Sequence, residues 1–155
     1  MHPRLRRITA DAQQVTQCFA DHPYIDIVRS EGQPPEKYEV HYKVRSMVLD
    51  ATGKPMPHIG FNAEIFLSLD YPRRPPFCRM LTPVFHPNID AQKICIGDHW
   101  SAGQRLVDLI VRIGEMLCYQ SYNTQSPLNA QAAAWSIEHG HELPLQRDDL
   151  VQNTI

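Results

Sequence analysis

A cysteine and an asparagine near the middle of the chain have side chains that could support acyl transfer. Cys95 lies between Ile94 and Ile96, seven residues after Asn88. A cysteine thiolate can accept an acyl group by thioester exchange and then pass it to an amine. Attack on that thioester builds an oxyanion, which an asparagine amide can stabilise by donating a hydrogen bond. Taken by itself, Cys95 between two isoleucines also fits a small buried apolar side chain.

The three other cysteines do not share this setting. Cys18 and Cys118 fall in predicted helices and Cys78 in a predicted strand, so we expect three free thiols in or near the core. The chain has four cysteines without a CxxC pair, and it is large enough to fold without disulfides. This usage is typical of a reducing compartment and favours a cytoplasmic location.

Two other chemistries compete for the same side chains. A zinc site would draw on Cys78, His86, Cys95 and His99. Structural zinc sites favour close pairs such as CxxC, and these spacings are irregular, so we predict no metal and no other cofactor. A cysteine hydrolase needs a general base beside the sulfur. His99 is near Cys95 in the sequence, but no pattern places its imidazole there.

The candidate residues lie in a stretch, residues 82–103, that shows neither a helical nor a strand period. A segment this long without regular structure inside a compact domain is more often functional than accidental. Tyr-Pro-Arg-Arg-Pro-Pro precedes it at residues 71–76, where the prolines hold the chain extended. The elements on either side must therefore position this stretch.

An amphipathic helix is predicted over residues 4–20. Apolar residues recur there at spacings of three and four and form a stripe of Leu5, Ile8, Ala12, Val15 and Phe19. Off that stripe lie Arg4, Arg6 and Arg7. We expect these arginines on the polar, solvent-facing side of the helix.

Four strands are predicted between this helix and the irregular stretch. A short one lies near residues 25–28, clear ones span 38–49 and 60–69, and a fourth covers 77–81. The apolar face of the third is predicted to hold Phe61, Ala63, Ile65, Leu67 and Leu69. Alternation of apolar and polar residues predicts an antiparallel sheet that is covered on one side.

Two helices are predicted after the irregular stretch. The first spans residues 105–118, and the second begins near Ser126, because serine suits the position before a helix and the following proline suits its first turn. A helix, a meander of about four strands, an irregular loop and two helices define an α+β domain. We expect this domain at residues 1–139, followed by a polar and frayed tail at residues 140–155.

The composition argues against several classes of function. A formal net charge of −2 does not favour nucleic-acid binding through bulk positive charge. No apolar run approaches the roughly 20 residues that a membrane span needs. The polar sequence after the basic first residues does not resemble a signal peptide. We therefore expect neither a nucleic-acid partner nor a membrane partner.

The motifs, taken in order, resemble those of the ubiquitin-conjugating enzymes. That family has Tyr-Pro-x-x-Pro-Pro, His-Pro-Asn, Ile-Cys and Trp-Ser before a long helix, and here they stand at residues 71–76, 86–88, 94–95 and 100–101. The resemblance covers roughly residues 4–139. It implies the ubiquitin-conjugating (UBC) fold and a transferase that carries a ubiquitin-like modifier as a thioester and passes it to an acceptor lysine.

The resemblance also implies roles for individual residues. Carried over position by position, Cys95 is the nucleophile that forms the thioester. Asn88 supports the oxyanion or the loop, and His86 has a structural role in shaping the loop. The family's first helix engages the activating enzyme, which implies a partner-binding role for Arg4, Arg6 and Arg7. The implied partners are a ubiquitin-like modifier, its activating enzyme and a target protein with an acceptor lysine.

The region expected to receive the acceptor lysine departs from the family pattern. The family often has an acidic residue just before the Pro-Leu that begins the third helix, where it orients or helps to deprotonate the lysine. Here that position is Ser126. Asp98 could substitute for the missing acid, and Tyr119 or Tyr122 could act through desolvation.

The positions that face ligases differ as well. An aromatic residue that docks RING or HECT ligases is replaced by Arg73, and a proline of the following loop is replaced by Ala102. A RING ligase is therefore a doubtful partner. These departures are similar to those of divergent bacterial members, some of which are encoded beside a modifier and an activating enzyme, in some cases for defence against phage. The alternative function is a non-catalytic UBC-fold module that binds a ubiquitin-like protein or its activating enzyme.

Overall fold

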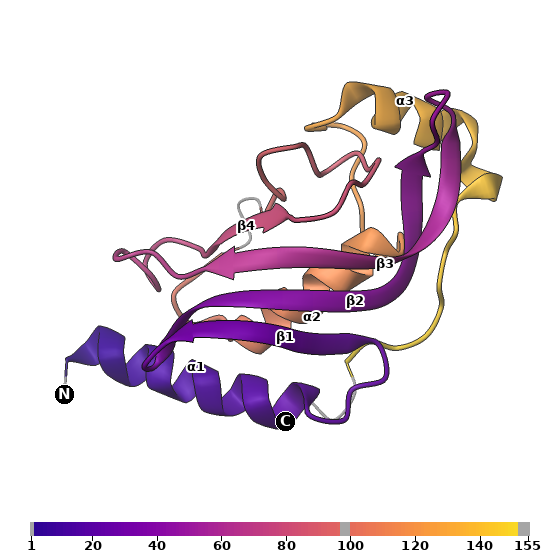
Figure 1. Cartoon of the computed structure of the whole chain (residues 1–155). Helices are drawn as coiled ribbons and strands as arrows, with labels where there is room; N and C mark the ends of the chain where they lie inside the picture. The colour runs from indigo at the N-terminus through magenta and orange to yellow at the C-terminus, as the bar shows by residue number, and fades with distance from the viewer. Residues whose placement is uncertain (1, 97–99, 152–155) are drawn as a thin grey trace.

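The computed structural model describes residues 2–96 and 100–151. Its elements follow the predicted order of one helix, four strands and two helices (Figure 1). They are α1 (Pro3–Phe19), β1 (Ile25–Gly32), β2 (Pro35–Leu49), β3 (Pro55–Phe66), β4 (Phe77–Met80), α2 (Leu106–Leu117), α3 (Ala130–Glu138) and the short 3-10 helix η2 (Gly140–Glu142). The predicted α+β class and the meander are confirmed.

The four strands pair antiparallel in the order β1-β2-β3-β4. The long hairpin of β2 and β3 bends away from the rest of the sheet at its tip (Figure 1). In the turn at the tip, the Asp50 carboxylate accepts hydrogen bonds from the backbone N–H groups of Thr52 and Lys54 at 2.8 and 2.9 Å. Gly53 supplies the positive φ of 85° that the turn requires.

The predicted third strand was wrong at both ends. β3 begins at Pro55 and stops at Phe66, and the Leu67 N–H closes the pairing by donating to the carbonyl oxygen of Glu36 at 2.7 Å. The chain turns immediately afterwards, so that Leu69 lies outside the sheet with 86% of its surface exposed. The alternation of apolar residues therefore continued in the sequence beyond the last paired position.

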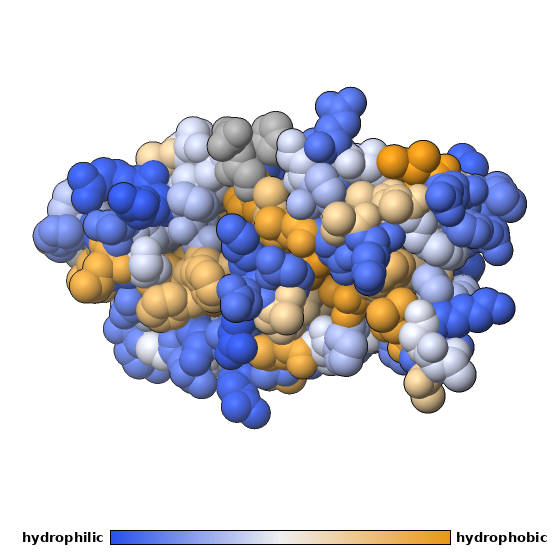
Figure 2. Space-filling view, turned by 90° about the horizontal axis from the view of Figure 1, so that it is seen from above, coloured by the Kyte–Doolittle hydropathy of each residue, from blue (hydrophilic) through white to orange (hydrophobic). Residues whose placement is uncertain are grey.

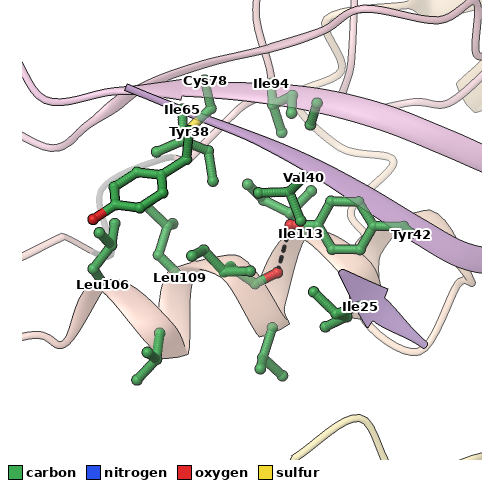
Figure 3. Packing of buried hydrophobic residues seen from close by; sticks show 14 of the residues in the cluster. Ile25, Tyr38, Val40, Tyr42, Ile65, Cys78, Ile94, Leu106, Leu109 and Ile113 are labelled. Carbon is green, nitrogen blue, oxygen red and sulfur yellow. Dashed lines mark hydrogen bonds between the residues drawn. The ribbon is translucent and has the colours of Figure 1, made fainter. Parts of the chain in front are cut away.

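The main core lies between the sheet and α2 (Figure 3). Its centre includes Val40, Tyr42, Ile65, Leu106, Leu109 and Ile113, all buried. Burying one such side chain contributes about 1.5–3 kcal/mol. The Tyr42 hydroxyl donates a 2.7 Å hydrogen bond to the carbonyl oxygen of Ile110, so its polar end is satisfied inside the core.

The buried face of α1 differs from the predicted stripe at three positions. Ile8, Val15 and Phe19 are buried as predicted, but Leu5 is 38% exposed, Ala12 is half-buried and the polar Asp11 is buried. The spacing of apolar residues could not predict the burial of Asp11, because a carboxylate is buried only where hydrogen-bonding or charged partners meet it.

Two of the three N-terminal arginines turn inward, contrary to the predicted solvent-facing side. Arg4 pairs with Glu36 at 3.0 Å and donates to two carbonyl oxygens at the end of β3 at 2.8 and 3.1 Å. Arg7 pairs with Asp11 at 3.0 Å. Arg6 is exposed. Intramolecular acceptors therefore hold two of the three guanidinium groups.

The second predicted C-terminal helix begins later than expected. Asn129, and not Ser126, precedes α3, and its Oδ1 accepts the N–H of Ala132 at 3.0 Å. The backbone N–H groups of Leu128 and Asn129 donate to the carbonyl oxygen of Pro87 at 2.9 and 3.1 Å. Asn129 itself has extended backbone angles, φ −123° and ψ 99°, so α3 starts only after it.

The segment after η2 is anchored as far as the structure describes it, so the expected fraying does not hold for residues 143–151. The Gln146 N–H donates to the carbonyl oxygen of Cys118 at 3.3 Å. The His22 Nε2–H donates to the carbonyl oxygen of Leu150 at 2.7 Å, and the Leu150 side chain is fully buried. A Cβ added at Gly114 would lie 3.0 Å from Leu150 Cδ1, so glycine permits this close approach.

Candidate functional site

Cys95 lies on a short loop that β-bridges tie to the core. Ile89 forms a bridge with Ile94, and the Ile94 N–H donates to the carbonyl oxygen of Cys78 at 2.8 Å. Ile94 and Ile96 are buried, whereas Cys95 between them is a partly exposed free thiol. The isoleucines therefore anchor the loop, and the alternation leaves the sulfur-bearing residue at the surface.

His86 is enclosed behind this loop. Its Nε2–H donates to the carbonyl oxygen of Met116 at 2.7 Å, and its Nδ1 accepts the N–H of Asn88 at 3.0 Å. Burial lowers the pKa of His86 to about 4, although the bond to Met116 opposes that change. The imidazole also stacks on Tyr119, with ring centroids 4.9 Å apart. A neutral histidine with both nitrogens engaged holds the loop and has no free basic nitrogen.

Asn88 connects two loops. Its Oδ1 accepts the N–H of Asn123 at 2.9 Å, and its Nδ2 donates to the carbonyl oxygen of the same residue at 2.7 Å. On the other side, the Cys95 N–H donates to the Asn88 carbonyl oxygen at 2.9 Å. An asparagine amide carries two N–H donors, so one is left after the bond to Asn123. Asn123, which sequence analysis did not single out, is thus a partner of the site.

The loop from Tyr119 to Asn129 borders the site and contains no acidic residue. Tyr119 is buried with a positive φ of 62°, and its ring meets the exposed ring of Tyr122 edge-on at 5.2 Å. Ser126 is exposed. Asp98 and His99 lie outside the described residues. Within the described part of the chain, the side chains that this loop brings to the site are therefore neutral polar and aromatic ones.

A second polar cluster, which sequence analysis missed, lies where α1 meets residues 71–76. The Arg7 Nη2 group donates to the Tyr71 hydroxyl at 2.9 Å, and that hydroxyl donates to Asp11 at 2.6 Å. Burial raises the pKa of Asp11, whereas the Tyr71 hydroxyl and Arg7 oppose that rise. Asp11 follows Arg7 by four residues, the spacing of helical ion pairs, so the sequence did contain a signal.

This cluster also secures the loop that follows the candidate nucleophile. Arg7 donates to the carbonyl oxygens of Ala102 and Gln104, and the Trp100 indole N–H donates to the carbonyl oxygen of Pro72 at 2.8 Å. The ring centroids of Trp100 and Tyr71 are 5.7 Å apart. Sequence motifs 71–76 and 100–101 are therefore neighbours in space, and α1 holds them together.

Arg73 is directed to solvent on the same loop. Its side chain is 83% exposed and that of Arg74 is 78% exposed, and both guanidinium groups approach the one carboxylate of Asp70, at 3.4 and 3.6 Å. Exposed ion pairs of this kind contribute about 0–1 kcal/mol. The loop therefore presents positive charge where the family often has an aromatic residue.

The described residues, 2–96 and 100–151, contain neither a metal-binding cluster nor a membrane-spanning helix. No group of three or more histidine, cysteine, aspartate or glutamate side chains lies close enough together to hold a metal ion. No helix in the same residues has the length and hydropathy of a membrane span.

The fold and this loop together define a class of protein. An N-terminal helix, a four-stranded meander, a fixed loop with a partly exposed cysteine and two further helices are the arrangement of the UBC fold. The family model described as "Ubiquitin-conjugating enzyme" matches residues 26–143. The chain belongs to the ubiquitin-conjugating enzyme family, a family of transferases.

Named relatives agree with this assignment. The chain is 27% identical over 127 residues to "Ubiquitin-conjugating enzyme E2 3" of Arabidopsis thaliana, a match that covers 79% of this chain and 82% of the relative. It is 43% identical over 54 residues to "Ubiquitin-conjugating enzyme E2 T" of Xenopus laevis, covering 34% of this chain and 28% of that protein. With "Ubiquitin-conjugating enzyme E2 S" of Dictyostelium discoideum the identity is 29% over 100 residues, covering 62% of this chain and 46% of the relative.

Solved structures show the same fold. A "Novel Ubiquitin-Conjugating Enzyme" superposes with a TM-score of 0.66 at 18% identity, covering 90% of this chain and 88% of the other. A structure titled "Ubiquitin conjugating enzyme (putative) from Trypanosoma cruzi" gives a TM-score of 0.65 at 18% identity. The match covers 90% of this chain and 93% of the other. At these identities the likeness establishes the fold, including the two C-terminal helices, and no more.

Proposed function

We propose that this protein is a carrier transferase that holds a ubiquitin-like modifier as a thioester on Cys95. The observation that carries the proposal is the position of this thiol. It is partly exposed between two buried isoleucines, on a loop fixed by His86 and Asn88, in a chain of the ubiquitin-conjugating family. Cys78 and Cys118 are buried in the core. Cys18 is partly exposed like Cys95, but it lies on α1 and packs against the core, away from any such loop.

The two proposed steps are nucleophilic substitutions at one carbonyl carbon. In charging, the Cys95 thiolate attacks the thioester between the modifier and its activating enzyme. A new C–S bond forms, the old C–S bond breaks, and the activating enzyme's thiolate leaves with the electron pair. In transfer, a neutral lysine amine attacks the Cys95 thioester. A C–N bond forms, the C–S bond breaks, Cys95 leaves as a thiolate, and the amine loses a proton to solvent or a nearby base.

Asn88 is proposed to serve both the loop and the oxyanion. Its side chain ties the Cys95 loop to Asn123 through both ends of the amide, and its remaining N–H is available for the oxyanion of the transfer step. His86 is proposed to have a structural role, since both of its nitrogens are bonded and its pKa is low. Ser126 and Asp98 stay candidates for orienting the acceptor lysine.

The structure reduces the number of N-terminal arginines proposed to contact a partner. The partners are a ubiquitin-like modifier, an activating enzyme and a target protein with an acceptor lysine. Of the three N-terminal arginines, Arg6 is the exposed one and is proposed to contact the activating enzyme. A cytoplasmic location and a bacterial pathway, including defence against phage, stay proposals from the sequence, and the three relatives named above are all eukaryotic.

The test is a charging reaction with the activating enzyme, the modifier and ATP, followed by a non-reducing gel. A band shift that thiols reverse is expected for the wild type. Cys95→Ser should give a thiol-resistant oxyester, because aminolysis of an oxygen ester is slower, and Cys95→Ala should carry nothing. Charging that survives in Cys95→Ala and vanishes when Cys18, Cys78 or Cys118 is replaced would refute the assignment.

One observation keeps the non-catalytic binding module as a second candidate. The loop from Tyr119 to Asn129 has no carboxylate to orient or deprotonate an acceptor lysine. A binding module would hold the modifier or its activating enzyme without forming a thioester. Equal affinity of the wild type and Cys95→Ala for both proteins, with no band shift for either variant, would support this alternative.

A further inference from the structure

A groove of about 620 Å³ lies beside the Cys95 loop, between the end of β4, residues 89–91 and the start of α3. Its larger apolar lining residues are Met80, Leu81, Pro83, Val84, Ile89 and Leu128. Figure 2 views the side of the molecule on which α3 and the loop after β4 lie, and it shows apolar side chains gathered among hydrophilic ones there.

Both walls of the groove are tied to the loop of the candidate nucleophile. Ile89 lines the groove and forms a β-bridge with Ile94, the neighbour of Cys95. On the opposite wall, Leu128 and Asn129 donate backbone hydrogen bonds to the carbonyl oxygen of Pro87, at 2.9 and 3.1 Å. A polypeptide that lies in the groove is therefore held against the loop that carries the thioester.

The groove also has a defined charge. Asp90 is its charged lining residue among those described, and Asp90 Oδ1 accepts the N–H groups of Gln92 and Lys93 at 2.8 and 2.9 Å. These backbone hydrogen bonds lower the pKa of Asp90, which keeps the carboxylate ionised near neutral pH. They engage one oxygen, so the other can accept a hydrogen bond from a cationic side chain.

We propose that this groove binds the segment of the target protein that flanks the acceptor lysine, and that it selects an apolar side chain with a basic side chain nearby. The inference rests on the proposed transfer from Cys95. An extended segment advances about 3.3 Å per residue, so residues next to a lysine at Cys95 can pass over Ile89 into the groove. The apolar wall accepts one side chain, and Asp90 favours a lysine or arginine.

The probes are short peptides, each with one lysine, one leucine and one arginine in an otherwise Gly-Ser sequence. The leucine is moved one position at a time along either side of the lysine. Fluorescence anisotropy measures binding to the uncharged protein, and single-turnover discharge of the Cys95 thioester measures transfer. One register is expected to accept the modifier about tenfold faster than a peptide without leucine, the low end for an apolar specificity contact.

Variants locate the effect. Leu81→Ser removes an exposed part of the apolar wall, and Asp90→Asn removes the charge while keeping the side-chain oxygen that the turn uses. Each should abolish most of the preference and leave discharge onto free lysine unchanged. The matched control is Ile137→Ser, which removes an apolar side chain that is 68% exposed on α3 and outside the groove. It should leave the preference intact.

The outcomes separate this inference from the function on which it rests. If the peptides bind in one register and depend on Leu81 and Asp90, but Cys95 never charges, then the transfer function fails and the groove is a peptide site. If charging and discharge onto free lysine succeed but no register is preferred, the groove inference is wrong. An equal preference in wild type, Leu81→Ser and Asp90→Asn overturns it too.

Discussion

Two buried polar clusters fix the two sides of the candidate site, and they differ in charge. Behind the Cys95 loop, His86 and Asn88 form a neutral cluster in which backbone groups supply most partners. Beside α1, Arg7, Asp11 and Tyr71 form an ionic cluster. The difference teaches that two solutions to burying polar groups coexist in one domain. The neutral cluster is sensitive to protonation, and the ionic cluster is sensitive to the loss of one partner.

The largest expected effect is on stability, in the ionic cluster. Arg7→Met keeps the length of the side chain but leaves the Asp11 carboxylate buried without its cation. Removing one partner of a buried ion pair costs about 3–5 kcal/mol. We expect the free energy of unfolding, measured by urea denaturation, to fall by that amount. Discharge of thioester that has already formed should keep its wild-type rate, because this cluster does not touch the reacting atoms.

A double variant sharpens the same point. Arg7→Met combined with Asp11→Leu removes both charges and fills the site with apolar atoms, which is often neutral compared with a buried ion pair. Most of the lost stability should return. If the double variant is as unstable as Arg7→Met, the unpaired carboxylate is not the cause, and the hydrogen bonds from Arg7 to the carbonyl oxygens of Ala102 and Gln104 account for the loss.

The second prediction concerns catalysis by the neutral cluster. Asn88→Ala should charge nearly normally, because the activating enzyme can help to stabilise that transition state. Discharge onto lysine should slow by about 100- to 1,000-fold, or about 2.7–4 kcal/mol, which is typical for one lost oxyanion donor. Single-turnover discharge of purified thioester measures the rate, and a melting curve run in parallel measures stability.

The hydrogen bonds to Asn123 suggest an alternative, in which Asn88 has a purely structural role. If Asn88 acts only by joining the two loops, charging, discharge and melting temperature should fall together. Asn88→Asp keeps an acceptor for the Asn123 N–H but removes the amide donors, so it separates the two roles further. A variant that discharges at the wild-type rate, or that does not fold, would contradict the oxyanion role and leave Cys95 as the catalytic assignment.

The third prediction is a pH dependence of stability that originates at His86. Its pKa is about 4 when folded and 6.5 ordinarily, so the unfolded chain binds more protons between these values. The stabilisation is complete above pH 6.5 and is lost as the pH falls towards 4. At about 1.4 kcal/mol per pKa unit, the loss is about 3 kcal/mol. Urea denaturation at a series of pH values measures it.

Two variants identify the residue responsible. The glutamine of His86→Gln has an N–H donor near the position of the imidazole Nε2 but does not titrate. This variant should therefore flatten the dependence of stability on pH between 6.5 and 4, while lowering stability overall. The control His58→Gln changes an exposed histidine on β3 and should keep the wild-type slope. An unchanged slope in His86→Gln would show that other groups produce the pH dependence.

The element order could be predicted from the sequence because period and turn chemistry are local. The errors arose where tertiary contacts decided the outcome. Leu69 continued an apolar alternation past the point at which Leu67 makes the last sheet contact. The helix expected near Ser126 starts only after Asn129, and the residues before it bind the carbonyl oxygen of Pro87, which is far away in sequence. Neither contact can be predicted from the residue pattern of one segment, because each joins segments that are distant in the sequence.

The candidate site could be predicted only as a set of motif positions. Cys95, Asn88 and His86 stood out by their order along the chain. The partner of Asn88, the backbone of Asn123, has no side-chain signature, so nothing in the sequence could single it out. The inward turn of Arg7 required knowing that Tyr71 lies beside α1. Roles that depend on backbone groups or on distant neighbours therefore needed the structure.

The smallest expected effect concerns the exposed arginines beside the ionic cluster. A charged, hydrated side chain at the centre of an apolar contact costs affinity unless it is paired, and Arg73 is 83% exposed. A RING domain should therefore accelerate discharge of the wild-type thioester by less than about tenfold, or about 1.4 kcal/mol. Arg73→Phe should increase that stimulation.

The control variant is Arg74→Phe, at the neighbouring and similarly exposed position. It removes the same charge and should not increase the stimulation. Tenfold or greater acceleration of the wild type would refute the prediction, and equal gains in both variants would show that charge alone limits docking.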